Sequence, residues 1–369
     1  MMTINSYMPV QIISGKGCFK ENYELLQKFG KSCLIVTGGT SAKKCGALSD
    51  VISCLEKLGI SYAVFDGITE NPYTADCHRA GACARETGAD FIIGIGGGSP
   101  LDASKAIAIY AANPSLSPED IYLRKYDNKP LPVVLVGTTS GTGSEVTGVS
   151  VLTDSSVNLK KSISGHDCYS VISFCDYTYT MTMPYSVTVS TALDAFAHAV
   201  EGYFSSTAND MSDIYAQKAF EMLRDGLLYF YNNKALPDEK LREQLYNASL
   251  IAGLCLNITG TCFPHTMGYI LTEDFAIAHG RACAAFIPDF IKISALNMPD
   301  KAQTLFDIMG MDCDTLCSLI ETLADINIKI SDEQMMKYTN RWTDPVKNFS
   351  RTPGNFTSAT AVDILKRWY

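Results

Sequence analysis

Four side chains in the second half of the chain are of the types that bind a divalent transition metal. Asp194 and His198 are four residues apart, so a helix would place the carboxylate and the imidazole on one face. His265 and His279 follow, 14 residues apart, among small and polar residues. One carboxylate and three imidazoles can complete the first shell of Fe²⁺, Zn²⁺, Ni²⁺ or Mn²⁺, whereas copper(I) and iron–sulfur clusters prefer sulfur. Each histidine alone could be an ordinary core or surface residue, but the four together predict a metal site.

A glycine-rich stretch in the first half is suited to binding a phosphate group. Gly96, Gly97 and Gly98 follow an apolar run and precede a predicted helix that contains Ser99 and Asp102. Glycines let the backbone approach a phosphate, and the next helix N-terminus offers free N–H groups. The stretch is not a Rossmann fingerprint, because serine stands where the third glycine is needed, and no Walker A lysine follows. The alternative is a simple strand-to-helix turn.

A second polar loop covers residues 137–145 and reads Gly-Thr-Thr-Ser-Gly-Thr-Gly-Ser-Glu. It follows an apolar run, and hydroxyl groups at the carboxyl end of a parallel strand are where α/β proteins bind ligands. Its hydroxyls alone could satisfy the loop's own backbone. Together with the glycine-rich stretch, however, the loop indicates a site for one extended ligand.

The elements that would position these groups divide the chain into two halves. Four apolar runs are predicted to be buried strands: 33–37, 61–65, 91–95 and 131–136. Helical stretches lie between them, and this alternation predicts a mostly parallel, Rossmann-like sheet covered on both faces. Beyond about residue 185 helical periodicity dominates. We therefore predict an α/β domain over residues 1–185 and an all-helical domain over residues 186–369.

The composition excludes several classes of protein. Of 369 residues, 47% are hydrophobic and 19% charged, which argues against disorder. A net charge of −9 argues against binding to nucleic acid, which lysine and arginine drive. No apolar run approaches the roughly 20 residues of a membrane helix, and we expect no secretory signal. The thirteen cysteines include no CxxC pair, so we expect free thiols in a cytoplasmic protein.

Four motifs occur in a fixed order along nearly the full chain. They are Gly-Gly-Gly-Ser-x-x-Asp-x-x-Lys at 96–105, Thr-Thr-Ser-Gly-Thr-Gly-Ser-Glu at 138–145, Asp-Ala-Phe-Ala-His-Ala-Val-Glu-Gly-Tyr at 194–203, and His-x13-His-Gly at 265–280. Together they resemble the iron-containing, or group III, alcohol dehydrogenases. The resemblance implies the architecture that these enzymes share with dehydroquinate synthases, and commonly a homo-oligomer such as a dimer.

The resemblance also implies roles for individual residues. The catalytic metal, Fe²⁺ or Zn²⁺, would be bound by Asp194, His198, His265 and His279. The nicotinamide cofactor would contact Asn71, Gly97, Gly98, Ser99, Asp102, Thr138, Thr139, Thr142 and Lys160. In such enzymes the metal acts as a Lewis acid on the alcohol oxygen while hydride passes to the nicotinamide.

Two positions depart from the family pattern. NAD-preferring members often carry an aspartate after the first strand of the sheet, where residues 37–44 read Thr-Gly-Gly-Thr-Ser-Ala-Lys-Lys. With Gly38, Ser41 and two lysines there, we expect space and charge for the 2′-phosphate of NADP(H), which is favoured over NAD(H). Many members also have a histidine four residues after the third ligand, where this chain has Tyr269. A tyrosine accepts protons poorly at neutral pH, so we interpret it as a pocket wall rather than part of a proton relay.

We therefore predict a metal-dependent, NAD(P)-linked alcohol dehydrogenase or aldehyde reductase for a small alcohol or aldehyde. A glycerol or diol dehydrogenase on the same fold is the main alternative. A metal-dependent hydrolase is disfavoured by the two cofactor loops. A non-catalytic nucleotide-binding protein is disfavoured by the complete set of metal ligands, although Tyr269 keeps that alternative open.

Overall fold

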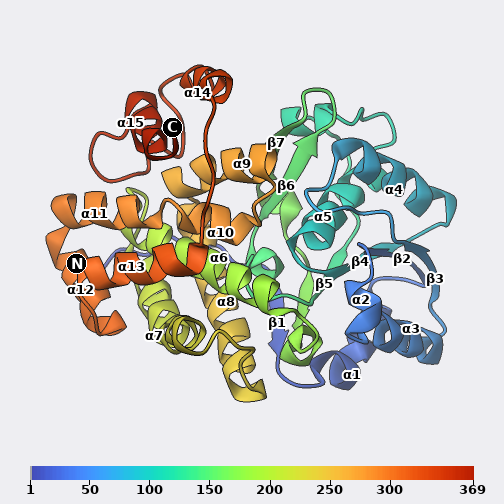
Figure 1. Cartoon of the computed structure of the whole chain (residues 1–369). Helices are drawn as coiled ribbons and strands as arrows, with labels where there is room; N and C mark the ends of the chain where they lie inside the picture. The colour runs from blue at the N-terminus through green and yellow to red at the C-terminus, as the bar shows by residue number, and fades with distance from the viewer. Residues whose placement is uncertain (1) are drawn as a thin grey trace. The chain divides into compact units, whose positions relative to one another are not determined.

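The computed structural model describes residues 2–369, which form two units. The α/β unit is Met8–Met183, and the helical unit consists of residues 2–7 and Pro184–Tyr369 (Figure 1). A parallel sheet in the first unit and a helix-rich second unit confirm the predicted fold class.

The first residues belong to the helical unit, whereas the predicted α/β domain began at residue 1. The side chain of Asn209 donates to the backbone oxygen of Asn5, and that of Asn257 donates to the oxygen of Tyr7. These bonds hold the segment against two long helices. The contact-based boundary then falls between Met183 and Pro184.

The sheet of the α/β unit has six parallel strands in the order β1-β8-β5-β4-β2-β3. Their bounds are β1 (Gln11–Ser14), β2 (Ser32–Thr37), β3 (Ser61–Phe65), β4 (Phe91–Gly96), β5 (Val133–Gly137) and β8 (Ile172–Cys175). The four predicted strands correspond to β2, β3, β4 and β5. An antiparallel pair, β6 (Val149–Asp154) and β7 (Leu159–Ser164), forms a separate ribbon after the second polar loop.

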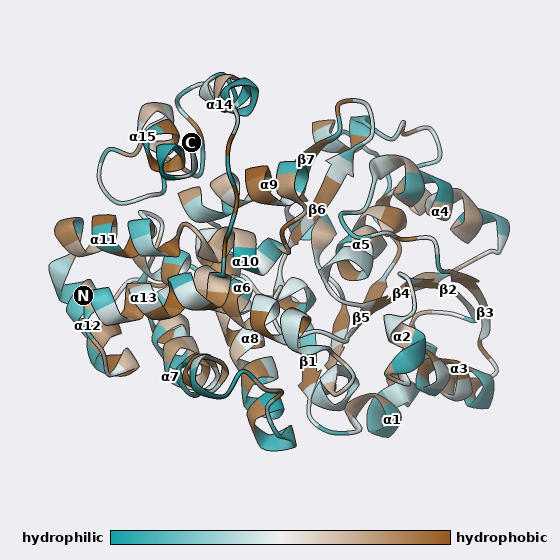
Figure 2. Cartoon of the chain, in the orientation of Figure 1, coloured by the Kyte–Doolittle hydropathy of each residue, from teal (hydrophilic) through white to brown (hydrophobic). Residues whose placement is uncertain are grey.

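Helices cover both faces of this sheet, which explains the continuous apolar runs of its strands. Their bounds are α1 (Cys18–Asn22), α2 (Ser41–Lys44), α3 (Ala47–Leu58), α4 (Thr74–Glu86) and α5 (Gly98–Ala112). Along β4, Ile92 packs in the core with α4 and α5, while its neighbours Phe91 and Ile93 pack in the core with α1 and α3. Figure 2 shows the hydrophobic residues running along β2 and β4, whereas α2 is largely hydrophilic.

The helical unit packs ten α-helices around one apolar core. They are α6 (Tyr185–Phe204), α7 (Asp210–Asn233), α8 (Glu239–Thr259), α9 (Phe263–Phe275), α10 (His279–Ala284), α11 (Ile287–Asn297), α12 (Pro299–Met309), α13 (Cys313–Ala324), α14 (Asp332–Thr339) and α15 (Ser358–Leu365). Asparagine and aspartate caps start several of them; for example, Asn209 opens α7 with a capping box. Helix α6 is the central element, because its residues from Thr188 to Phe204 are almost all buried.

Two further features concern the chain as a whole. All thirteen cysteines are free, and ten of them are buried. Within residues 2–369, no helix is both long and apolar enough to cross a membrane.

Candidate metal centre and cofactor loops

The carboxylate of Asp194 lies at the middle of three imidazole rings in the helical unit. Its Oδ1 atom is 3.8 Å from His198 Nε2, 3.5 Å from His265 Nε2 and 3.9 Å from His279 Nε2. Asp194 and His198 come from α6, His265 from the first turn of α9, and His279 from the start of α10. The four predicted ligands are therefore brought together from three helices.

Small residues allow these helices to approach closely. A Cβ atom on Gly280 would lie 1.8 Å from the backbone oxygen of Ser190, so only glycine fits after His279 at this crossing of α10 and α6. Gly268 of α9 similarly leaves room for Cys283 of α10, since a Cβ there would lie 3.0 Å from the thiol sulfur. These two glycines, which have no side chain to bind a ligand, thus allow the helices with the histidine rings to pack closely.

The donor atoms fit a divalent cation. Asp194 Oδ1 and His265 Nε2 are buried, and neither has a hydrogen-bond partner among residues 2–369. Such orphaned polar atoms are costly unless something else satisfies them. Donors about 2.1 Å from a tetrahedral ion are separated by about 3.4 Å, close to the 3.5–3.9 Å observed here.

The neighbouring histidines favour the ionised form of the Asp194 carboxyl group. Burial alone would raise the pKa of Asp194, but His198, His265 and His279 hold it well below its ordinary value. Burial also opposes a charge on His265; nevertheless Cys283, Glu201 and Asp194 together raise the pKa of His265 well above its usual value. A proton and a metal ion would therefore compete for the same ring.

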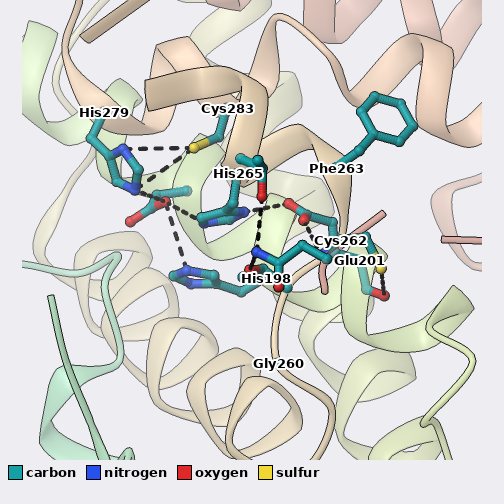
Figure 3. Close-up of polar contacts among 12 residues, drawn as sticks. His198, Glu201, Gly260, Cys262, Phe263, His265, His279 and Cys283 are labelled. Carbon is teal, nitrogen blue, oxygen red and sulfur yellow. Dashed lines mark hydrogen bonds and ion pairs between the residues drawn. The ribbon is translucent and has the colours of Figure 1, made fainter. Parts of the chain in front are cut away.

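Two residues of this cluster are absent from the predicted site. Glu201 is fully buried on α6, and its carboxylate contacts Nδ1 of His265 (Figure 3). Its position gives a signal, because residues 194, 198 and 201 are spaced i, i+4, i+7 and so share one face of a buried helix. Cys283 lies four residues after His279, and its sulfur is 3.7 Å from both ring nitrogens. The sequence does not distinguish Cys283 from the other twelve cysteines, so it could not have indicated that this thiol lies in the cluster.

In the α/β unit, the glycine-rich stretch and the second polar loop lie side by side. A Cβ atom on Gly97 would come within 2.9 Å of the Thr139 side chain, and one on Gly98 within 2.8 Å of Thr142. The Oγ of Ser99 accepts a hydrogen bond from the backbone N–H of Asn71, which has a left-handed φ of 56°. The structure therefore gathers most of the predicted cofactor residues at the carboxyl ends of β4 and β5.

Asp102 has a defined structural role at this edge. Its Oδ1 accepts from Ser144 Oγ at 2.5 Å, and its Oδ2 accepts from the N–H of Val151 at 2.8 Å. Lys105, which is 1% exposed, donates from Nζ to Ser144 Oγ and to the backbone oxygens of Thr147 and Val149. These two charged side chains hold the second loop and β6 onto α5.

Two buried hydroxyls at the strand ends have no hydrogen-bond partner in the described part of the chain. They belong to Thr138, which follows β5, and to Thr37, the last residue of β2. Thr138 is among the predicted cofactor contacts, whereas Thr37 is not. Both provide polar atoms that a ligand could satisfy.

Comparison with known proteins identifies the family. One family model, iron-containing alcohol dehydrogenase, matches residues 9–177, and the C-terminal model of the Fe-containing alcohol dehydrogenase family matches residues 188–339. An iron-containing alcohol dehydrogenase from Thermotoga maritima has a solved structure with a TM-score of 0.90 and 33% identity, covering 99% of both chains. The chain belongs to the iron-containing alcohol dehydrogenase family.

Curated relatives of this iron-containing alcohol dehydrogenase act on small molecules, as their names state. The 1,3-propanediol dehydrogenase of Klebsiella pneumoniae is 32% identical over 299 residues, which cover 79% of this chain and 75% of the relative. The NADPH-dependent butanol dehydrogenase of Clostridium saccharobutylicum is 28% identical over 338 residues, which cover 90% of this chain and 84% of the relative. The predicted enzyme class, an oxidoreductase that acts on CH–OH groups, is confirmed.

The remaining predicted cofactor residues lie around the ends of β2 and β7. Gly38 is required by close packing, since a Cβ would be 2.5 Å from the backbone oxygen of Ile68. Ser41 is exposed at the start of α2, and Lys160 is half-buried on β7. Residues 37–44 hold no carboxylate, but Asp66 supplies one, 3.4 Å from Lys43 Nζ.

Tyr269 lies beside the metal cluster. Its ring stacks on that of His279, with centroids 5.8 Å apart and planes 17° apart. It is half-buried on α9. This arrangement is compatible with the predicted role as a wall next to the metal.

Proposed function

We propose that this protein is a metal-dependent, NAD(P)-linked alcohol dehydrogenase or aldehyde reductase whose ion is bound by Asp194, His198, His265 and His279. The observation that carries the proposal is the position of Asp194 Oδ1, which is buried, has no hydrogen-bond partner in residues 2–369 and lies within 3.9 Å of three imidazole nitrogens. An ion bound there would supply Lewis acidity, which lowers the pKa of an alcohol and polarises an aldehyde carbonyl.

The chain's own residues would contribute binding and orientation. Asp194 would provide the anionic ligand, and the three histidines the neutral ones. Thr138, Thr139 and the backbone of Gly97 and Gly98 would hold the dinucleotide, while Asp102 keeps the second loop in place. Oxidation of the alcohol releases its hydroxyl proton as well as the hydride that passes to the nicotinamide. Because a tyrosine accepts protons poorly at neutral pH, we assign Tyr269 to the pocket wall and the released proton to solvent.

The first test is a metal and cofactor matrix. The protein is stripped of metal, supplied with Fe²⁺ or Zn²⁺, and mixed with short aldehydes while NADPH or NADH absorbance is followed. We expect metal-dependent oxidation of the reduced cofactor. The variant His265→Ala should lose both bound metal and turnover, and unchanged turnover with unchanged metal content in that variant would overturn the ligand assignment.

For the cofactor, we propose that NADP(H) is preferred. Gly38, Ser41, Lys43 and Lys44 leave space and positive charge for a 2′-phosphate, and a relative is named as NADPH-dependent. Asp66 acts against this preference, because its carboxylate forms an exposed ion pair with Lys43 and partly offsets the lysine charge. The ratio of kcat/KM for NADPH over NADH measures the balance, and we expect the variant Asp66→Asn to raise this ratio and Lys43→Ala to lower it by about threefold to tenfold.

The substrate we propose is a small alcohol or aldehyde. A diol is the second candidate, because a relative of 32% identity is a 1,3-propanediol dehydrogenase. Assays with short alcohols, glycerol and diols in the oxidative direction would separate the two. We further propose a homodimer in the cytoplasm; the thirteen free thiols support a reducing compartment, and light scattering on the purified protein tests the oligomer.

A further inference from the structure

We propose that Glu201 is a positioning residue that fixes His265 in the orientation and tautomer required to bind the metal. The inference rests on the proposed function only in that it takes His265 as a metal ligand. It concerns a buried carboxylate that does not itself touch the reacting atoms.

Glu201 uses its two carboxylate oxygens in two directions. Oε1 contacts Nδ1 of His265, and Oε2 accepts a hydrogen bond of 2.7 Å from the backbone N–H of Cys262. Cys262 is the residue just before α9, so the carboxylate connects α6 to the start of the helix that carries His265. The side chain of Glu201 is fully buried, so water does not replace either contact.

The two ring nitrogens of His265 therefore face different carboxylates. Nδ1 contacts Glu201, while Nε2 is 3.5 Å from Asp194 Oδ1 and has no hydrogen-bond partner among the described residues. Figure 3 shows His265 between Glu201 on one side and His279 on the other.

The chemistry of the pair determines the tautomer. A carboxylate only accepts hydrogen bonds, so Nδ1 must carry the proton, and the neutral ring then presents its lone pair at Nε2. Ligand histidines in metal sites commonly donate their second N–H to a carboxylate in this way, which fixes the ring and raises its basicity. Without Glu201, the ring could carry its proton on Nε2, which cannot bind a cation.

Replacement by glutamine tests this arrangement, because an amide has only one oxygen. If that oxygen faces His265, the NH₂ group opposes the N–H of Cys262. If the amide flips, the NH₂ group donates to Nδ1 and drives the proton to Nε2. Either way the pair of contacts seen with Glu201 cannot be kept.

The experiment titrates metal-free protein with Co²⁺ and follows its visible absorption, which reports both affinity and ligand geometry. We expect Glu201→Gln to weaken Co²⁺ binding by about 10-fold to 100-fold and to change the spectrum. His265→Ala should bind Co²⁺ much more weakly. At the higher Co²⁺ concentrations that this variant requires, adding Glu201→Gln should change the affinity by no more than about twofold, because the effect of Glu201 passes through His265.

A matched control removes a buried polar contact of the same helix start. Thr352 is buried, and its Oγ accepts from the N–H of Phe263, the residue after Cys262. Within residues 2–369, it forms no hydrogen bond with His265 or Glu201. Thr352→Val should lower the Tm and leave Co²⁺ affinity within about twofold of wild type. If Glu201→Gln does not fold, Glu201→Asp keeps the charge but shortens the reach, and we expect about threefold to tenfold weaker binding.

The outcomes are distinguishable. Wild-type affinity and spectrum in Glu201→Gln, together with weakened binding in His265→Ala, would overturn the role of Glu201 and leave the metal site standing. Equal weakening in Glu201→Gln and Thr352→Val at equal loss of Tm would also overturn it, since the role would then be structural. Failure of the wild-type chain to bind one Co²⁺ would instead refute the proposed metal site itself.

Discussion

In the helical unit the candidate site consists of titratable side chains on three helices, whereas in the α/β unit it consists of backbone and hydroxyl groups on loops that follow strands. Asp194 and His265 are buried and individually specific, and each has an atom that nothing in residues 2–369 hydrogen-bonds. In the glycine-rich stretch and the second loop, ligand binding would instead be divided among several backbone and hydroxyl groups.

The supporting residues differ in the same way. In each site a buried charged group contacts the residues that would bind the ligand: Glu201 contacts His265, and Lys105 donates to the second loop. Glu201 contacts one ring and one backbone N–H, while Lys105 donates to a side chain and two backbone oxygens of the loop region. The comparison teaches that the metal site should respond to single ligand changes, and the loops to changes of backbone and packing.

The largest effect is expected at the centre of the metal cluster. Asp194→Asn removes the anion that lies among three imidazole rings, so we expect kcat/KM to fall by about 10³-fold or more. Metal analysis of the purified variant should show loss of the ion, and cofactor binding followed by fluorescence should be retained. A variant with full metal content and near-normal turnover would contradict the expectation that the metal site depends on single ligands.

A smaller effect, on stability, is expected from the buried lysine of the α/β unit. Lys105→Met leaves the Asp102 carboxylate and two backbone oxygens without their cation, which should cost about 3 kcal/mol in the free energy of unfolding. Denaturant titration measures this. The double variant Asp102→Asn/Lys105→Met should recover part of the loss, because the unpaired charge is then removed.

A change in loop packing should act on the cofactor alone. The methyl group of Gly98→Ala would lie 2.8 Å from Cγ2 of Thr142, so we expect the KM for the cofactor to rise by about tenfold to thirtyfold. Thr142→Ser removes that Cγ2 atom, and the double variant should recover much of the loss. Co²⁺ affinity should not change in either variant; a parallel loss of metal would show that the two sites are not independent.

The smallest effect concerns acid stability of the α/β unit. Asp154 accepts hydrogen bonds from Lys161 and Ser156, which lower its pKa from 3.8 to about 2. A carboxyl group with a lower pKa in the folded state stabilises that state above pH 4, and the contribution disappears as the pH falls from about 4 to 2. Since Lys161 is half-exposed, we expect about 1 kcal/mol.

The matched variant for this prediction is Asp154→Asn. The difference in unfolding free energy between wild type and Asp154→Asn should be present at pH 5 and vanish near pH 2. A difference that stays constant over this range would mean that the ion pair with Lys161 contributes nothing.

Patterns that depend on neighbouring residues could be predicted from the sequence. The strands β2, β4 and β5 were predictable because both faces of each are buried, which leaves an unbroken apolar run. The edge strand β3 is partly exposed and was predictable only from its short apolar run. Asp194 and His198 were predictable because four residues make about one helical turn. His265 and His279 were predicted from their residue type and their place in the same half of the chain. The family resemblance, which the comparisons confirm at the level of the family, then implied the ligand role of all four residues.

Features that depend on distant pairing could not be predicted. β8 has four residues, including a buried serine, Ser173, and its place between β1 and β5 follows only from the folded sheet. Glu201 and His265 are 64 residues apart, and Lys105 and Thr147 are 42 apart, so no local spacing links them. The role of Asp102 in loop packing likewise emerges only once Val151 is placed beside it.

The thirteen free cysteines have a practical consequence for handling the protein. Ten of them are shielded in the folded chain, so oxidants reach few thiols while it stays folded. Complete thermal unfolding would expose all thirteen, and in air the released thiols can form disulfides between chains faster than the chain refolds. Thermal denaturation without a reductant should therefore be irreversible and depend on scan rate, whereas a reductant should restore refolding.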